Sequence, residues 1–217
     1  MTPYYSHAGI TIFHGDCREI LPHVGPMDAV ITDPPYGINI GSRSGGDRGK
    51  CTPENGRRDV FGDDQAFDPE ALLVMQRPTI LWGANHYADR LPVSRCWLVW
   101  DKRDGGTSDD SSDAELAWTS LDAPVRLMRH LWRGMIKASE RDERRVHPTQ
   151  KPVALMAWCL QLFPDAETIL DPFMGCGTTL VAAKNLGRKA IGIELEEKYC
   201  EIAAKRLSQE VFDFQVA

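Results

Sequence analysis

Short apolar runs alternate with stretches of helical spacing along most of the chain. An apolar run bounded by Gly, Pro or Asp predicts a buried strand. The predicted strands are Ile10–His14, Asp28–Thr32, Thr79–Trp82, Cys96–Trp100, Thr168–Leu170 and Lys189–Glu194. The predicted helices are Cys17–His23, Pro69–Gln76, Pro152–Phe163, Thr178–Leu186 and Glu196–Leu207. This alternation predicts an α/β fold with a mostly parallel central sheet and helices on both faces.

Two regions depart from the alternation. The segments Leu116–Trp118 and Val125–Trp132 carry apolar residues that predict a hairpin or a meander. Residues 41–66 are rich in Gly, Ser, Asp and Arg and have no apolar period. A stretch of that length without a pattern predicts a long loop of functional or disordered character.

The length of 217 residues and the composition, 42% hydrophobic and 26% charged, predict a single globular domain over residues 1–217. No apolar run approaches the roughly 20 residues that cross a bilayer. The N-terminal segment Met1–Ile10 lacks the basic and then apolar order of a signal peptide. The six cysteines form no C-x-x-C pair. We therefore expect a cytoplasmic protein with free thiols and with neither a membrane segment nor a metal site.

The net charge of −6 disfavours a protein that simply coats nucleic acid. Two segments are basic, however: residues 122–151 hold eight Lys and Arg against four acids, and residues 41–58 hold five against two. Two basic segments on an acidic body predict one side that faces phosphates. Two solvated surface segments are the alternative that the charge alone supports equally well.

A glycine turn near the C-terminal end predicts a nucleoside-cofactor site. The strand Thr168–Leu170 leads into the turn Asp171-Pro172-Phe173-Met174-Gly175-Cys176-Gly177-Thr178-Thr179, where a helix begins. Its glycines permit close approach of a ligand, and the helix start offers N–H donors. Glu194 ends the next strand at the spacing of a carboxylate that binds ribose hydroxyls. Leu180 replaces the third glycine of a dinucleotide motif, which disfavours nicotinamide and suits S-adenosylmethionine; a purely structural turn is the alternative.

The tetrapeptide Asp33-Pro34-Pro35-Tyr36 at the end of the strand Asp28–Thr32 predicts a catalytic turn. An exocyclic amine on a nucleic-acid base is a poor nucleophile, because its lone pair is delocalised into the ring. The Asp33 carboxylate and the Pro34 carbonyl can accept its two N–H groups and localise that lone pair. Pro35 holds the turn rigid, and Tyr36 offers an aromatic face for an extruded base. A rigid proline turn without a catalytic role is the alternative.

Four blocks of the sequence together resemble the DNA amino-methyltransferases, which modify N6 of adenine or N4 of cytosine. These blocks are Phe13-His14-Gly15-Asp16-Cys17, Thr32-Asp33-Pro34-Pro35-Tyr36-Gly37, His147-Pro148-Thr149-Gln150-Lys151-Pro152, and Asp171 through Thr179 with Glu194. The catalytic block precedes the cofactor block, an order similar to the circularly permuted beta group of that family. The resemblance implies a circularly permuted, Rossmann-like methyltransferase fold that binds S-adenosyl-L-methionine.

The resemblance also implies a role for each matching residue. Asp16 and Cys17 are expected near the cofactor adenine, and Glu194 at the ribose. The methionine end is expected to meet Asp33, Thr149, Gln150, Lys151, Asp171, Phe173, Gly175, Cys176, Gly177, Thr178 and Thr179. For His147, a hydrogen-bonded loop histidine is favoured over a general base.

Asp rather than Ser at position 33 is similar to the adenine-modifying enzymes, so the expected substrate is N6 of adenine, flipped out of double-stranded DNA. Cytosine N4 and an RNA base are the alternatives within this class. From other classes, a nucleotide-dependent oxidoreductase leaves Asp33–Tyr36 unexplained, and a non-catalytic DNA-binding module leaves both motifs unexplained. We expect residues 103–146 to recognise the target, and residues 41–66 to form a mobile loop near the target base. The short recognition segment leaves a homodimer open. Asn85, His86 and Tyr87 follow a strand end and are further candidates for the pocket.

Overall fold

The structure is a computed structural model that describes residues 1–39, 61–106, 112–133, 136–141, 146–147 and 149–209. The predicted loop over 41–66 therefore lies outside the described residues, except for its last six, 61–66. Cys51 lies outside them as well, and the other five cysteines are free thiols.

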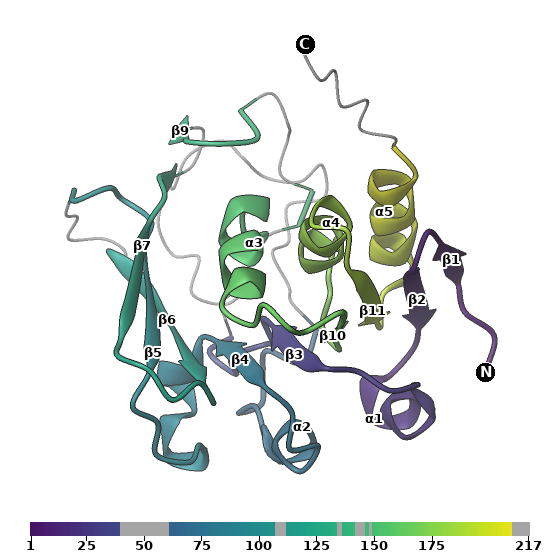
Figure 1. Ribbon diagram of the computed structural model, residues 1–217, viewed down its shortest axis with the longest axis horizontal. Coiled ribbons are helices and arrows are strands. Elements are labelled where there is room, and N and C mark those ends of the chain that lie inside the picture. Colours follow the sequence, from purple (N-terminus) through teal and green to yellow (C-terminus); the bar gives the residue numbers. More distant parts are fainter. Residues whose placement is uncertain (40–60, 107–111, 134–135, 142–145, 148, 210–217) are drawn as a thin grey trace.

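A nine-stranded sheet runs through the described part of the chain, in the order β1-β2-β11-β10-β3-β4-β6-β5-β7 (Figure 1). The strands are β1 Tyr5–His7, β2 Ile10–His14, β3 Ala29–Thr32, β4 Thr79–Trp82, β5 Trp97–Asp101, β6 Ala114–Thr119, β7 Arg126–Arg129, β10 Thr168–Asp171 and β11 Lys189–Glu194. A second, two-stranded sheet consists of β8 Trp132–Arg133 and β9 Ile136–Lys137. The central strands β2, β11, β10, β3 and β4 are parallel to one another, as the alternation of strands and helices predicts.

The predicted hairpin or meander of Leu116–Trp118 with Val125–Trp132 is wrong. Strand β6 enters the sheet between β4 and β5 and runs antiparallel to both, so that Trp118 pairs with Leu81 on one side and Trp97 on the other. Strand β7 instead joins β5 from its far side, parallel to it. Burial explains this arrangement, since a strand that contains Ala117, Trp118 and Thr119, all buried, gains more apolar contact inside the sheet than in an isolated hairpin.

Helices cover both faces of the sheet (Figure 1). The helices α3 Val153–Gln161, α4 Thr178–Asn185 and α5 Glu197–Ser208 lie side by side on one face. The short helices α1 Cys17–Ile20 and α2 Glu70–Leu73 lie on the other, with the 3-10 turns η1 Leu21–His23, η2 Ala84–His86 and η3 Ala88–Arg90. No helix in these described ranges is long and apolar enough to cross a membrane.

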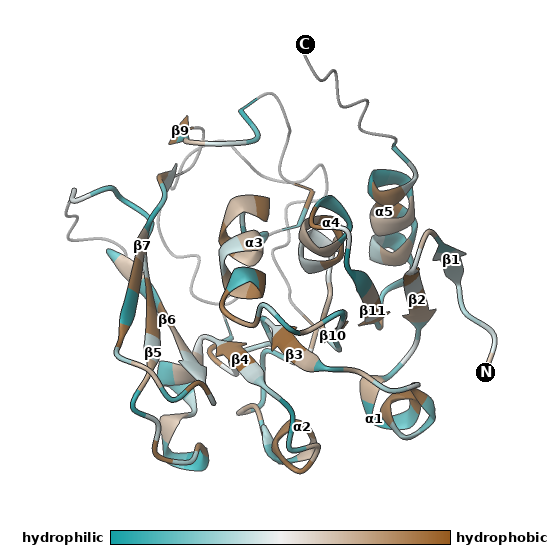
Figure 2. Cartoon of the chain, in the orientation of Figure 1, coloured by the Kyte–Doolittle hydropathy of each residue, from teal (hydrophilic) through white to brown (hydrophobic). Residues whose placement is uncertain are grey.

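Each face of the sheet has its own apolar core. Ile31 and Ile80 pack with residues of α3, α4 and α5, whereas Val30, Leu81 and Leu170 pack toward α1 and α2. All four residues of β3 are buried, as is typical of a strand that is covered on both faces. Figure 2 shows β3 as largely hydrophobic, whereas α5 combines hydrophobic and hydrophilic residues.

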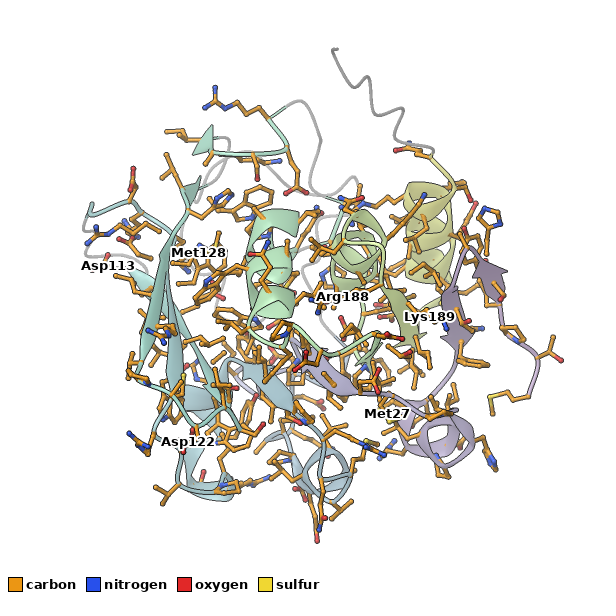
Figure 3. The ribbon with its side chains drawn as sticks, viewed as in Figure 1. Met27, Asp113, Asp122, Met128, Arg188 and Lys189 are labelled. Carbon is orange, nitrogen blue, oxygen red and sulfur yellow. The ribbon has the colours of Figure 1, made fainter. Side chains whose placement is uncertain are left out.

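Arg188, labelled in Figure 3, connects the C-terminal end of helix α3 to the sheet. It stands directly before β11, and its guanidinium donates to the carbonyl oxygens of Leu160 at 2.8 Å and Phe163 at 2.9 Å. These carbonyls lie at the C-terminal end of α3, where backbone acceptors lack helical partners. The contact therefore fixes the helix that follows the His147–Pro152 block against the strands of the cofactor motif.

Candidate functional site

The two predicted motifs meet because their strands are neighbours. Strands β3 and β10 pair in parallel, so the turns at their carboxyl ends emerge on the same edge of the sheet. The Thr32 hydroxyl at the end of β3 donates to Asp171 Oδ1 at the end of β10, at 2.6 Å. This hydrogen bond joins two residues that are 139 positions apart in the sequence. The sheet thus brings the Asp33–Tyr36 turn beside the glycine turn.

A narrow cleft, open to solvent, lies between the two turns and the start of α3. Its walls are formed by Asp33, His147, Thr149, Gln150, Lys151, Met156, Asp171, Phe173, Met174, Gly175, Cys176, Thr178 and Thr179. Ten of these thirteen residues were predicted for the site from the sequence. Of the remaining predicted residues, Glu194 reaches the cleft through a hydrogen bond to Gly175, and Tyr36 through one to Asp33.

Both oxygens of the Asp33 carboxylate have fixed partners. The Tyr36 hydroxyl donates to Oδ1 at 2.5 Å, and the Lys151 ammonium donates to Oδ2 at 2.7 Å. Burial raises the pKa of Asp33, although the positive charge of Lys151 and the hydrogen bonds from both partners oppose that rise. Each oxygen keeps one further lone pair. Asp33 is therefore oriented and still able to accept a hydrogen bond from a substrate.

Lys151 uses all three of its donors on the catalytic side of the cleft. Its ammonium lies 2.7 Å from Asp33, 2.9 Å from the Tyr36 hydroxyl and 3.1 Å from Glu115 Oε2. An ammonium group has three N–H donors, so these acceptors match its full capacity. Contact between Lys151 and the cofactor stays a prediction; in the structure its partners are the residues of the catalytic turn and Glu115.

Glu115 is the member of this cluster that carries no sequence motif. It lies on β6, and its second oxygen accepts from Lys102 at 3.0 Å. Burial acts to raise the pKa of Glu115, but the charges of Lys151 and Lys102 outweigh it and hold that pKa at about 2. Two lysines and two carboxylates thus form one balanced group of charges, Lys102–Glu115–Lys151–Asp33.

The ring of Tyr36 is held from several sides. It stacks on His86 of η2 with ring centroids 5.3 Å apart and planes inclined by 17°. The backbone of Gly83 approaches so closely that a Cβ there would lie 2.0 Å from Tyr36 Cε1. Gly83 also has a φ of +67°, a conformation that favours glycine. His86, one of the three candidates after β4, therefore stacks on the ring of Tyr36 that was predicted to receive a base.

The glycine turn presents its polar groups toward the cleft. Gly175 N–H donates to Glu194 Oε2 at 3.0 Å, and Glu196 N–H donates to Oε1 at 2.7 Å. These bonds fix the carboxylate while leaving it lone pairs for a ligand. Gly177, at φ +78°, begins α4 without a side-chain cap, which leaves the helix start to backbone N–H groups. A carboxylate and N–H donors in one cleft fit the ribose and methionine groups of a nucleoside cofactor.

Asp171 has a structural bond as well as a place in the wall. Its Oδ1 accepts from Thr32 and from Phe173 N–H at 3.2 Å. Burial raises the pKa of Asp171 to about 6, against the hydrogen bonds from Thr179, Thr32 and Phe173. The Asp171 carboxylate is ionised above that pH, and it lies at the carboxyl ends of the paired strands β10 and β3.

Four residues of the next block, His147, Thr149, Gln150 and Lys151, form the third wall of the cleft. The Nδ1 atom of His147 accepts from Thr149 N–H at 3.3 Å, and burial lowers the pKa of this histidine to about 4. Gln150 Oε1 accepts from Val146 N–H at 3.0 Å. His147 is thus neutral near pH 7 and bonded within its own loop, as favoured from the sequence.

Asp16 and Cys17 lie next to the Glu194 strand end rather than in the cleft wall. Gly15 N–H donates to the Glu194 carbonyl at 2.9 Å, which brings their loop to β11. The Asp16 carboxylate accepts from Arg18 N–H at 2.9 Å and caps α1. Burial raises the pKa of the Cys17 thiol to about 11, so that it is not a nucleophile at neutral pH.

Residues 61–66 contact the catalytic turn. Asp63, only 5% exposed, accepts through Oδ1 from Gly37 N–H at 2.9 Å and from Ile38 N–H at 3.2 Å. These two residues follow Tyr36 directly. The described end of the predicted 41–66 loop is therefore fastened to the turn that carries Asp33.

Comparison with known proteins gives consistent matches. The N6/N4 methyltransferase family, described as DNA methylase, matches residues 108–205. The type II methyltransferase M2.LlaDCHI of Lactococcus lactis subsp. cremoris is 28% identical over 95% of this chain and 92% of its own length. M2.DpnII of Streptococcus pneumoniae is 27% identical over 96% and 93%, and M.HinfI of Haemophilus influenzae 26% identical over 92% and 68%.

Two solved structures share the fold. The M1.HpyAVI–SAM complex has a TM-score of 0.56 at 23% identity and covers 92% of this chain and 100% of that chain. The PvuII DNA methyltransferase, described as cytosine-N4-specific, has a TM-score of 0.60 at 15% identity and covers 96% and 89%. The α/β fold predicted from the strand and helix pattern is confirmed, and so is its Rossmann-like form, which the family resemblance implied.

Proposed function

We propose that the chain is an S-adenosylmethionine-dependent DNA amino-methyltransferase that methylates N6 of adenine in double-stranded DNA. The observation that carries the proposal is the fixed Asp33 carboxylate at the edge of a cleft whose far wall is the glycine turn. Asp at the head of this tetrapeptide, where Ser is typical of the cytosine N4 enzymes, favours adenine.

The residues of the chain divide between holding the cofactor and orienting the amine. Glu194 would hold the ribose, and Asp171 and the turn from Gly175 to Thr179 would hold the methionine end of S-adenosylmethionine. When bound, this cofactor supplies an electrophilic methyl group on a sulfonium. Asp33 and the Pro34 carbonyl accept the two N–H groups of the amine, so that its lone pair points toward the cleft.

The target base is proposed to leave the duplex and stack at Tyr36. A base inside the helix cannot reach Asp33, because stacked neighbours cover it. The Tyr36 ring stacks on His86 at 5.3 Å between centroids. A base inserted between two rings needs about 7 Å, twice the contact distance of aromatic carbons. His86, which is exposed, would therefore shift outward by about 2 Å, or the base would replace it on Tyr36.

DNA is proposed to lie along the segment 103–146, with residues 41–66 near the target base. The described part of that segment gathers Arg129, Lys137 and Arg141 around one surface hollow, against the single acid Asp104 among the residues that line it. Cations in a hollow suit the phosphate backbone. The contact between Asp63 and the residues after Tyr36 supports the place of residues 41–66 near the target base.

We also propose that two copies of the protein act together on one DNA site. The protein is further proposed to be cytoplasmic, where its described free thiols stay reduced.

Cytosine N4 is the second candidate target, because one of the similar folds, that of the PvuII enzyme, is described as cytosine-N4-specific. Incubation of the purified protein with labelled S-adenosylmethionine and unmethylated genomic DNA, followed by mass spectrometry of the nucleosides, decides between them. N6-methyladenine supports the proposal, and N4-methylcytosine transfers it to the second candidate. If neither nucleoside carries label although the cofactor binds, the DNA substrate is wrong.

Glu194→Gln is expected to weaken S-adenosylmethionine binding about 10- to 100-fold, since a hydrogen bond to a charged group contributes about 1.5–3 kcal/mol. The amide nitrogen would also face one of the two backbone N–H groups that the carboxylate now accepts. Isothermal titration calorimetry of the protein without DNA measures the change. Glu201→Gln on the exposed side of α5 removes the same charge away from the cleft and is expected to bind normally. Equal affinity in the two variants would contradict a ribose contact.

Gly83→Ala is expected to reduce methyl transfer by about tenfold or more, because a Cβ 2.0 Å from Tyr36 Cε1 must displace the ring. Displacement moves the hydroxyl that orients Asp33. Alanine at φ +67° adds a strain of about 1–2 kcal/mol, so a modest fall in Tm is expected as well. Gly187→Ala on the α4–β11 turn has φ +68° and open space around its Cβ, and it serves as the control for strain alone. If both variants methylate DNA at the same rate, the position of Tyr36 is unimportant.

A further inference from the structure

Glu115 belongs to none of the sequence motifs, yet it is the hub of the buried charges behind the catalytic turn. Its two oxygens bind two different ammonium groups, Lys102 at 3.0 Å and Lys151 at 3.1 Å. Its side chain is 25% exposed, and that of Lys151 only 6%. A carboxylate that holds a buried lysine contributes to where that lysine lies, because breaking such a pair leaves an uncompensated charge.

The ammonium of Lys151 is shared between two carboxylates. Asp33 lies 2.7 Å from it on one side and Glu115 3.1 Å on the other. In addition, the Tyr36 hydroxyl accepts the third N–H at 2.9 Å. An ammonium divided among three acceptors binds each of them less strongly than it would bind one alone. Glu115 therefore limits how far Lys151 neutralises Asp33.

We propose that Glu115 is a positioning residue of the methyl-transfer site, which shares the Lys151 ammonium with Asp33 and thereby keeps Asp33 a strong acceptor for the target amine. The proposal rests on the proposed function, since the amine is the group that Asp33 would hold. Glu115 acts through Lys151 and has no contact with Asp33 of its own. Lys102 holds Glu115 from the opposite side and completes the neutral group.

Loss of the Glu115 charge has two expected consequences. Lys151 turns wholly to Asp33 and Tyr36, which weakens Asp33 as an acceptor. The pKa of Asp33 also falls, because the negative charge of Glu115 helps to raise it. The two carboxylates share the Lys151 nitrogen and lie within about 6 Å of each other, so the charge of Glu115 acts on Asp33 at short range.

The test compares Glu115→Gln and Glu115→Asp with the unchanged protein and with Glu201→Gln, at saturating S-adenosylmethionine and DNA. In Glu115→Gln, kcat is expected to fall about 10- to 100-fold and the acidic limb of its pH profile to move to lower pH. Affinity for S-adenosylmethionine should change by less than about twofold. Glu115→Asp, which retains the charge, should restore the acidic limb and part of kcat. Glu201→Gln should match the unchanged protein.

Two results would overturn the proposal. One is an unchanged kcat in Glu115→Gln; the other is a fall in kcat with an unmoved acidic limb, equal in Gln and Asp variants, which would mark a purely structural role. If the unchanged protein methylates no DNA, the proposed function fails instead. In that event, NMR titration of the Asp33 carboxyl carbon without DNA still tests Glu115: its pKa must fall in Glu115→Gln and return in Glu115→Asp.

Discussion

Asp33→Ala is expected to lower methyl transfer by about 10³-fold or more while S-adenosylmethionine still binds. One preorganised acceptor contributes about 10²–10³-fold, and Asp33 also holds Tyr36 and Lys151 in place. Positive charge develops on the amine during transfer, so a neutral side chain cannot replace the carboxylate. Asp33→Asn, of the same shape, is expected to lose nearly as much, because its amide nitrogen would face the Tyr36 hydroxyl or the Lys151 ammonium.

Single-turnover transfer of labelled methyl groups measures the rate in these variants, and calorimetry measures the cofactor affinity separately. Asp165→Ala in the exposed loop before β10 is the matched control. If Asp33→Ala weakens S-adenosylmethionine binding by the same factor as it lowers the transfer rate, the main role of Asp33 is to bind the cofactor. Full activity in Asp33→Ala would exclude this mechanism altogether.

Lys151→Met is expected to have the largest effect on stability, a loss of about 3 kcal/mol in the free energy of unfolding at pH 8. The change leaves Asp33 and Glu115 facing each other without the ammonium between them. We expect the lower end of the usual range of about 3–5 kcal/mol, because the side chains of Asp33 and Glu115 are 17% and 25% exposed to solvent. Methyl transfer should be lost as well, since Asp33 loses the partner that orients it.

The pH dependence of this loss follows from the sign of the Asp33 shift. Lys151 lowers the pKa of Asp33 against burial, so its removal raises that pKa further. The folded variant then takes up a proton more readily than its unfolded chain, and its stability rises as pH falls through the raised pKa. Urea unfolding at pH 8 and pH 5.5 should show the smaller deficit at pH 5.5. Lys205→Met, with an exposed lysine, is the control; a deficit independent of pH would contradict the charge argument.

The sequence predicted the parts of the site that lie in continuous motifs. Strands β2, β4 and β11 have the predicted bounds, because short apolar runs between Gly, Pro and Asp leave little choice. Each motif was predicted at the end of an apolar strand, and β3 and β10 pair so that these two ends lie on the same edge of the sheet. Asp33 and Asp171 do meet at that edge.

Contacts between distant polar residues could not be predicted. Glu115 stands in a stretch without a motif, and Lys151 looked like a ligand of the cofactor because its block resembles a cofactor block. Their ion pair depends on β6 entering the sheet between β4 and β5, and the local pattern of β6 fits a hairpin equally well. Register in a sheet is decided by all the strands at once, whereas periodicity describes one segment at a time.

The strand order also bears on how the protein is made. The last two strands that the structure describes, β10 and β11, lie between β2 and β3, which are among the first. During synthesis from the N-terminus, β2 and β3 must wait for their neighbours, with their edges unpaired, until residues 168–194 have emerged. Long-range pairing of this kind is slow, and open edges invite aggregation. A chain cut short before β10 would lose the middle of its sheet rather than one border.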